Sequence, residues 1–230
     1  TAATSQTACA AGTYQPDTGQ SSCDDADPGH YVDHSASAEQ YECVLGTFQP
    51  YSGQSSCLLA NHGHYVNTNA ATSQTACAAG TYQANTGQSS CLGADAGYFV
   101  AGPGSDSQAA CSPGTYQPDI GQSSCLDADA GYYVGTTAAT SQTACAAGTY
   151  NPNTGQDSCT EADPGHFVDS EASTAQTPAP ADYYAEGLAS TSPEPCPETF
   201  MTLEAGSDSP EDCHLDSDGD RSPDYDDDDD

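Results

Sequence analysis

The sequence predicts a small disulfide-rich all-β protein, an elongated solenoid-like rod of 34-residue repeats, each built from two 17-residue β-hairpin halves. Cysteines alternate spacings of 14 and 20 residues from Cys9 to Cys159. A fixed period without insertions is the signature of stacked structural repeats rather than of one globular core. Glycine recurs every 17 residues with an aromatic side chain within two positions after it, at Gly12, Gly29, Gly46, Gly63, Gly80, Gly97, Gly114, Gly131, Gly148 and Gly165.

Two kinds of half alternate along the repeats. An A half carries one cysteine three residues before its glycine and one eleven residues after it, as in Cys9 and Cys23. A B half has alanine and glutamine at these positions, as in Ala26 and Gln40. Because a B half lacks both cysteines together, we expect the two cysteines of one A half to be partners. Spacing alone leaves a rival pairing open, which joins Cys23 with Cys43 and leaves Cys9 without a partner.

Disulfides are needed because the chain offers few large apolar side chains, with no tryptophan and one methionine. Each predicted bridge closes a loop of about 15 residues and contributes roughly 3 kcal/mol in the chain-entropy model. Bridges at this density indicate an oxidising compartment, so we expect a secreted protein that is extracellular or at the cell surface. The predicted pairs are Cys9–Cys23, Cys43–Cys57, Cys77–Cys91, Cys111–Cys125, Cys145–Cys159 and, in a larger loop, Cys196–Cys213.

Turn chemistry predicts the hairpin within each half. In the first A half, residues 13–15 are typical of a short strand, and residues 16–19 form a turn with proline first and glycine last. Residues 20–23 are expected to return as the second strand. In the B halves, a segment such as residues 97–100 predicts a strand that a Ser/Thr/Ala-rich return segment follows. We expect the aromatic side chains to form a ladder along the stacked hairpins.

The repeat pattern divides the chain into four regions. Residues 1–176 contain five 34-residue repeats, and residues 177–195 contain a degenerate half in which Asp182 replaces the glycine. Residues 196–213 form an atypical disulfide-closed cap, as terminal repeats often do. Residues 214–230 form an acidic, aspartate-rich tail.

The segment CAAGTYQPDTGQSSC, residues 9–23, resembles the cysteine-rich repeats of ephrin-receptor-like and tumour-necrosis-factor-receptor-like ectodomains. Such repeats read Cys-x-x-Gly-Thr-Tyr, then a glycine turn, then Ser-Cys, and long arrays of them occur in microbial surface proteins. The resemblance covers residues 1–176 and implies an elongated ladder of hairpins. That family usually has further cysteines where this chain has Ala128, Ala130 and Val134, which argues against a receptor-type disulfide pattern.

Charge restricts the partners that the chain can bind. It contains 34 acidic residues and one basic residue, Arg221, for a net charge of −33. This excludes an electrostatic nucleic-acid partner. No hydrophobic segment is long enough to cross a bilayer, so we expect no membrane insertion by these residues. Self-repulsion favours an extended chain.

Alternating aspartates in the tail predict a calcium site. Ca²⁺ takes six to eight oxygen ligands, and a single loop with carboxylates at this spacing supplies several of them. The segment resembles the aspartate-rich calcium repeats of thrombospondin type 3 and dockerin-like proteins, although Arg221 stands where their turn has glycine. The alternative is a solvated acidic run without a ligand. The predicted ligands are Asp216, Asp218, Asp220, Asp224 and Asp227.

Three large apolar residues of the second repeat, Tyr51, Leu58 and Leu59, break the repeat pattern. We predict an interface with a neighbouring chain there, the alternative being scattered surface residues without a role. No enzymatic activity is expected, because a catalytic constellation is singular and every candidate motif here is repeated.

The sequence therefore predicts an extracellular structural protein, the repeating subunit of a filament, appendage or surface layer. The expected partner is the chain itself in head-to-tail contact, an open heterologous arrangement. O-linked glycans on the Ser/Thr-rich B halves are a further expectation, with plain polar surface as the alternative. The alternative function is that of a ligand-binding receptor or adhesin ectodomain.

Overall fold

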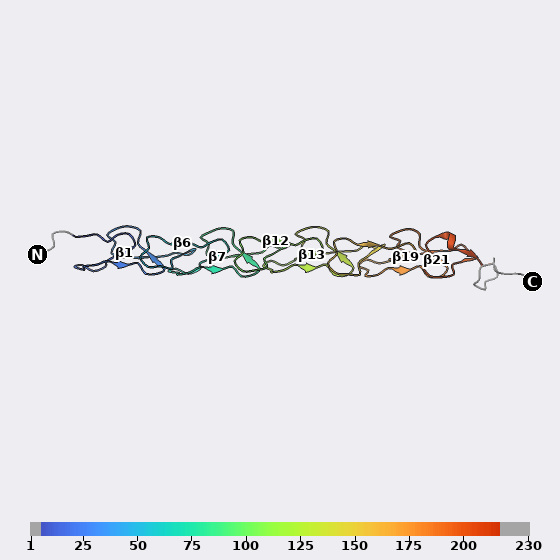
Figure 1. Ribbon diagram of the computed structural model, residues 1–230. Coiled ribbons are helices and arrows are strands. Elements are labelled where there is room, and N and C mark those ends of the chain that lie inside the picture. The colour runs from blue at the N-terminus through green and yellow to red at the C-terminus, as the bar shows by residue number, and fades with distance from the viewer. Residues whose placement is uncertain (1–5, 217–230) are drawn as a thin grey trace, which may run out of the picture. The chain divides into compact units, whose positions relative to one another are not determined.

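The computed structural model describes residues 6–216, and the chain divides into two compact units. Unit 1 contains Thr1–Ala110 and Asp119–Ser124, and unit 2 contains Cys111–Pro118 and Cys125–Asp230. Figure 1 shows that the hairpins within each unit follow one another in chain order. Both units repeat one pattern of backbone hydrogen bonds and glycine contacts.

The described residues form twelve two-stranded antiparallel sheets, each made of two consecutive strands of two residues. In the first sheet, Thr13 lies opposite Asp25 and Tyr14 opposite Asp24. The single helical element of the described chain is the 3₁₀ turn η1 (Pro210–Asp212), so the all-β prediction is confirmed. The strands are β1 (Thr13–Tyr14), β2 (Asp24–Asp25), β3 (His30–Tyr31), β4 (Tyr41–Glu42), β5 (Thr47–Phe48), β6 (Leu58–Leu59), β7 (His64–Tyr65), β8 (Thr75–Ala76), β9 (Thr81–Tyr82), β10 (Leu92–Gly93), β11 (Tyr98–Phe99), β12 (Ala109–Ala110), β13 (Thr115–Tyr116), β14 (Leu126–Asp127), β15 (Tyr132–Tyr133), β16 (Thr143–Ala144), β17 (Thr149–Tyr150), β18 (Thr160–Glu161), β19 (His166–Phe167), β20 (Thr177–Pro178), β21 (Tyr183–Tyr184), β22 (Glu194–Pro195), β23 (Phe200–Met201) and β24 (His214–Leu215).

Each sheet belongs to one half of the repeat pattern, and we number the halves from the N-terminus. A half begins three residues before the position of its glycine, which we call the glycine slot. Odd-numbered halves up to half 9 are A halves, and even-numbered halves up to half 10 are B halves. The halves are residues 9–25, 26–42, 43–59, 60–76, 77–93, 94–110, 111–127, 128–144, 145–161, 162–178, 179–195 and 196–215.

The return strand of an A half follows the second cysteine, so its predicted position at residues 20–23 is wrong. A side chain explains the difference. Gln15 Nε2 donates to the Ser22 carbonyl at 2.9 Å, and Gln15 Oε1 accepts from the Asp17 backbone N–H at 3.0 Å. This amide holds the intervening residues as a loop, and backbone pairing resumes only at β2.

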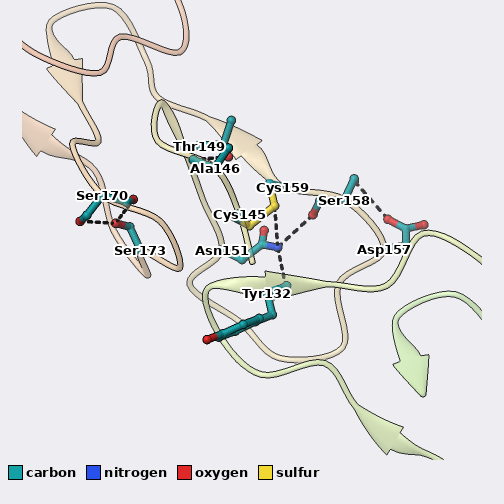
Figure 2. Close-up of a disulfide and its surroundings, with 10 residues drawn as sticks. All are labelled: Tyr132, Cys145, Ala146, Thr149, Asn151, Asp157, Ser158, Cys159, Ser170 and Ser173. Atoms are coloured by element: carbon teal, nitrogen blue, oxygen red, sulfur yellow. Dashed lines mark hydrogen bonds between the residues drawn. A yellow bond between two sulfur atoms is a disulfide. The ribbon is translucent and has the colours of Figure 1, made fainter. Parts of the chain in front are cut away.

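Six disulfides each close a single half, and they join the partners that the paired absence of cysteines in B halves favours. Five bridges span 14 residues and the sixth spans 17. The rival pairing of Cys23 with Cys43 is therefore wrong. In half 9, the buried Asn151 amide donates to the Tyr132 and Ser158 carbonyls at 2.9 and 3.0 Å beside the Cys145–Cys159 bridge (Figure 2).

Four of the five B halves replace the disulfide by a clamp, in which a glutamine side chain bonds both the backbone N–H and the carboxylate of an aspartate. In half 8, Gln142 Oε1 accepts from the Asp129 backbone N–H at 2.7 Å, and Gln142 Nε2 donates to Asp129 Oδ2 at 2.6 Å. Ala128, which stands where an A half has its first cysteine, is completely buried. The clamp thus ties together the segments that a disulfide joins in an A half. The same pair of bonds joins Gln40 to Asp27, Gln108 to Asp95 and Gln176 to Asp163.

Removing the clamp in half 8 should destabilise unit 2. We expect Gln142→Ala to lower the free energy of unfolding by about 0.5–1.5 kcal/mol, because it removes two hydrogen bonds at a site that water can reach. Denaturant unfolding under non-reducing conditions measures this loss. Gln156→Ala is the matched control, since the Gln156 amide bonds only the nearby Thr154 carbonyl. Equal stability of the two variants would contradict the clamp.

Backbone hydrogen bonds connect each half to the next within a unit. The Gly46 N–H donates to the Val66 carbonyl, and the Ala70 N–H donates to the Cys43 carbonyl, both at 2.8 Å. These bonds join halves 3 and 4, and equivalent bonds recur between the consecutive halves of each unit. The stacking within a unit is therefore solenoid-like, with backbone pairing both inside and between hairpins.

Glycine occupies its slot because the turn of the half after next packs directly on it. A Cβ at Gly46 would lie 2.1 Å from the carbonyl oxygen of Gly87, in the turn of half 5. Across nine such slots, a Cβ would lie between 2.0 and 2.3 Å from the nearest backbone oxygen, a separation that no side chain can adopt. The φ of Gly46 is 83°, in the left-handed region that glycine alone adopts freely. Within a unit, each half with such a slot therefore contacts the next two halves.

The aromatic residues after the glycine slot are mostly half-buried, but they do not form the predicted ladder of rings. Among the tyrosine and phenylalanine rings of the described residues, the one ring contact joins Tyr31 to Tyr41, with centroids 5.9 Å apart within half 2. Small buried residues form the core instead. Val66 is 3 % exposed and Ala60 and Cys43 are completely buried.

Candidate interaction surface

Half 3 presents more large apolar side chains to solvent than any other half of the described chain. The halves on either side of half 3 expose mainly polar side chains, so these exposed apolar side chains are unusual. The exposed fractions are 63 % for Val44, 52 % for Leu45, 68 % for Tyr51, 46 % for Leu58 and 57 % for Leu59. We call these five residues the apolar patch. Sequence reasoning identified three of them and missed Val44 and Leu45, which replace alanine pairs in other A halves.

The hairpin of half 3 fixes the position of the patch. Leu58 and Leu59 form β6, where Leu58 lies opposite Phe48 and Leu59 lies opposite Thr47. Successive residues of a strand point to opposite faces, so the two leucines cover both sides of this edge. Tyr51 lies in the turn before β6, where its backbone N–H donates to Gln49 Oε1 at 3.2 Å.

The fold does not require apolar side chains at these positions. The equivalent positions of half 1 form the same turn and the same strand pair with carboxylates in place of apolar groups. The patch is therefore a property of this half and not of the repeat. The correspondence is Tyr51 for Asp17, Leu58 for Asp24 and Leu59 for Asp25.

A long uncharged stretch of sequence begins with the half that carries the patch. No aspartate, glutamate, lysine or arginine occurs between Glu42 and Asp95, although the chain has a net charge of −33. We call residues 43–94 the neutral segment, and it contains all of halves 3, 4 and 5. Its titratable histidines bond to backbone carbonyls, with His62 Nδ1 2.7 Å from the Ala84 oxygen. The apolar patch thus lies at the start of the longest charge-free part of the sequence.

An open groove borders the patch between halves 2 and 3. It has a volume of about 310 Å³ and is lined by Tyr31, Asp33, Val44 and Cys57, among others. A second open groove of about 400 Å³ follows residues 168–177 of half 10 and is lined mainly by hydroxyls and carboxylates. Both are surface depressions beside loops rather than enclosed pockets.

Two phenols near carboxylates have raised pKa values. Partial desolvation, together with the negative charge of Glu39, raises the pKa of Tyr41 in half 2. A hydrogen bond from the Tyr184 hydroxyl to Glu194 Oε2 at 3.1 Å raises the pKa of Tyr184. Both side chains are therefore uncharged at neutral pH and add nothing to the negative charge of the chain.

The predicted calcium ligands lie mostly beyond the described residues. Asp216 is the one inside them, and its backbone N–H donates to the Thr199 carbonyl at 2.8 Å. The other four, Asp218, Asp220, Asp224 and Asp227, lie outside the described residues. Within residues 6–216, no group of three His, Cys, Asp or Glu side chains is placed to hold a metal ion. Calcium binding by the tail stays a prediction.

A calorimetric titration of the whole chain with CaCl₂ tests that prediction. We expect one site that Asp218→Asn together with Asp220→Asn abolishes, because Ca²⁺ sites lose affinity as carboxylate ligands are removed. The matched control is Asp24→Asn with Asp25→Asn, which removes the same charge from β2. Equal heats from the two variants would mean that calcium only screens the acidic chain.

Two comparisons, with protein families and with curated proteins, give no match to this chain. No protein-family model matches it, and no curated protein matches it. The resemblance to receptor-type cysteine-rich repeats therefore stays a prediction. None of the described residues forms a helix of the length and apolarity needed to cross a membrane. Six disulfides in a regular pattern are consistent with an extracellular protein.

Proposed function

We propose that this chain is an extracellular structural protein, the repeating subunit of a filament, appendage or surface layer, and that it associates with itself. The observation that supports the proposal is the repeated contact between the halves of each unit. Backbone bonds join consecutive halves of each unit, and nine glycine slots contact the half after next, so each unit repeats one contact without a specialised centre. Disulfides close the five A halves and half 12, and clamps hold halves 2, 6, 8 and 10.

The chemistry of the surface also supports a structural role. Polymers outside the cell face proteases, and a chain with one lysine or arginine offers trypsin-like enzymes almost no cleavage sites. The high negative charge keeps single chains soluble until a specific contact forms.

A ligand-binding receptor or adhesin ectodomain is the second candidate. The apolar patch favours it, since exposed apolar patches mark protein-binding sites in general. The two functions differ in the partner: a structural subunit binds its own kind, whereas a receptor binds another molecule.

Imaging of the native assembly tests the proposal. Antibodies raised against the chain, bound to unfixed surface material from the source cells, should label filaments or layers at a regular repeat distance in negative-stain microscopy. Single labels scattered over the cell surface would overturn the structural proposal and favour the receptor. Recombinant chain provides the control, because preincubation with it should remove the label.

A further inference from the structure

We propose that copies of this chain meet side by side through the neutral segment, with the apolar patch of one copy against the apolar patch of the second. The proposal rests on the structural function above and names the surface that such a subunit would use. It also assigns the kind of contact, an isologous one in which both copies contribute the same residues. Such a contact closes at two copies, so a filament or layer would join these pairs through a second contact.

Charge selects this part of the surface. Two chains of net charge −33 repel each other, and at physiological ionic strength charges interact over about 8 Å. A close contact therefore forms most readily where neither copy carries a charge. Residues 43–94 are the longest stretch without a charged residue, and they form three consecutive halves of unit 1.

Side-chain chemistry selects half 3 within the neutral segment. Its five exposed apolar residues remain in contact with water in the single chain. Burying them against the same patch of a second copy removes this apolar surface from water, while the Asp33 and Glu42 carboxylates stay at its border. Tyr51, the most exposed of the five, is of a residue type enriched in interface cores.

The C-terminal end of the stack argues against an end-to-end alternative. In nine halves a Cβ at the glycine slot would collide with the turn of the half after next. In halves 11 and 12 the slot holds Asp182 and Thr199, with φ of 71° and 73°. A second copy that continued the stack would press its turns against these two side chains. The side chains of Asp182 and Thr199 therefore disfavour a stacking contact at halves 11 and 12, which favours a side contact.

Restoring the residues of half 1 in half 3 tests the proposal. The variant Tyr51→Asp, Leu58→Asp, Leu59→Asp gives half 3 the side chains that half 1 already accommodates. Sedimentation of the full oxidised chain over a range of concentrations measures association. We expect dimers or larger species for the wild type, and at least a tenfold weaker apparent association for the variant. Added salt should strengthen wild-type association, because it screens the repulsion between acidic chains.

The control adds equal charge outside the neutral segment. Asn153→Asp, Thr154→Asp and Thr160→Asp place three carboxylates at exposed positions of half 9. We expect this control to associate like the wild type. Equal weakening by both triple variants would overturn the proposal, because general repulsion would then explain the loss. A variant in half 3 that associates like the wild type would overturn it as well.

Two further outcomes separate this proposal from the proposed function. If the wild type is monomeric at all concentrations but binds uncharged phosphatidylcholine vesicles through half 3, the occupant is a lipid surface and the second-copy assignment is wrong. If native filaments form while the half 3 variant assembles normally, the structural function stands and the surface is wrong. Mass spectrometry of the unreduced variants, which counts the six disulfides, confirms that each has folded.

Discussion

Replacing Gly46 by alanine is expected to lower the free energy of unfolding by roughly 2–5 kcal/mol, a large loss for the addition of a single methyl group. Left-handed backbone costs a non-glycine residue about 1–2 kcal/mol. Forcing an extra atom into a packed site costs about 1–3 kcal/mol more. At Gly46 both costs apply, because the added Cβ would lie 2.1 Å from the Gly87 carbonyl oxygen and φ is 83°. Denaturant unfolding and hydrogen exchange of halves 3 to 5 measure the loss.

Two other glycines separate the two causes. Gly121 has a φ of 73° with no atom within 4 Å of its Cβ position, so Gly121→Ala introduces the backbone strain alone. Gly102 has open space and no positive φ, so Gly102→Ala should change stability by less than about 0.5 kcal/mol, as surface substitutions do. We expect the order Gly46, Gly121, Gly102 from most to least destabilising. Equal effects at Gly46 and Gly121 would mean that the contact between halves 3 and 5 contributes nothing.

The sequence was sufficient for the features that repeat by residue type. The spacing of glycine and cysteine predicts the hairpin halves, and the paired absence of cysteines in B halves predicts the partners of Cys9 and of each later first cysteine. Contacts between a half and the half after next could not be predicted. They depend on the rise and rotation per half, which backbone hydrogen bonds such as that from Gly46 to Val66 determine.

The role of the glutamine in B halves also needed the structure. The sequence shows Gln142 at the position that the second cysteine has in an A half. Asp129, however, is a common turn residue, and nothing in the sequence indicates that its partner lies 13 positions away. Three residues of the interaction surface, in contrast, can be recognised in the sequence. Tyr51, Leu58 and Leu59 stand out because they break a repeat, whereas their exposure to solvent depends on the loop that the Gln49 amide holds, through its bond to the Ser56 carbonyl.

The second large effect concerns the disulfides. We expect Cys77→Ala with Cys91→Ala to lower the free energy of unfolding by about 3 kcal/mol, because the oxidised loop no longer restricts the unfolded chain. Denaturant unfolding of the oxidised protein measures this loss. The corresponding bridge in half 5 spans 14 residues, like those of the other A halves.

Converting half 5 into a B half should recover part of this loss. In the variant Cys77→Ala, Ala78→Asp, Cys91→Gln, the new pair stands in the same positions as Asp129 and Gln142 in half 8. A hydrogen bond that water can reach contributes about 0.5–1.5 kcal/mol, so we expect this variant to be more stable than the double alanine variant by about that amount. The clamp acts on the folded state, whereas a disulfide acts mainly on the unfolded chain. Reducing agent should therefore destabilise the wild-type half 5 and leave the converted half unchanged, and a converted half no more stable than the double alanine variant would show that the two devices are not equivalent.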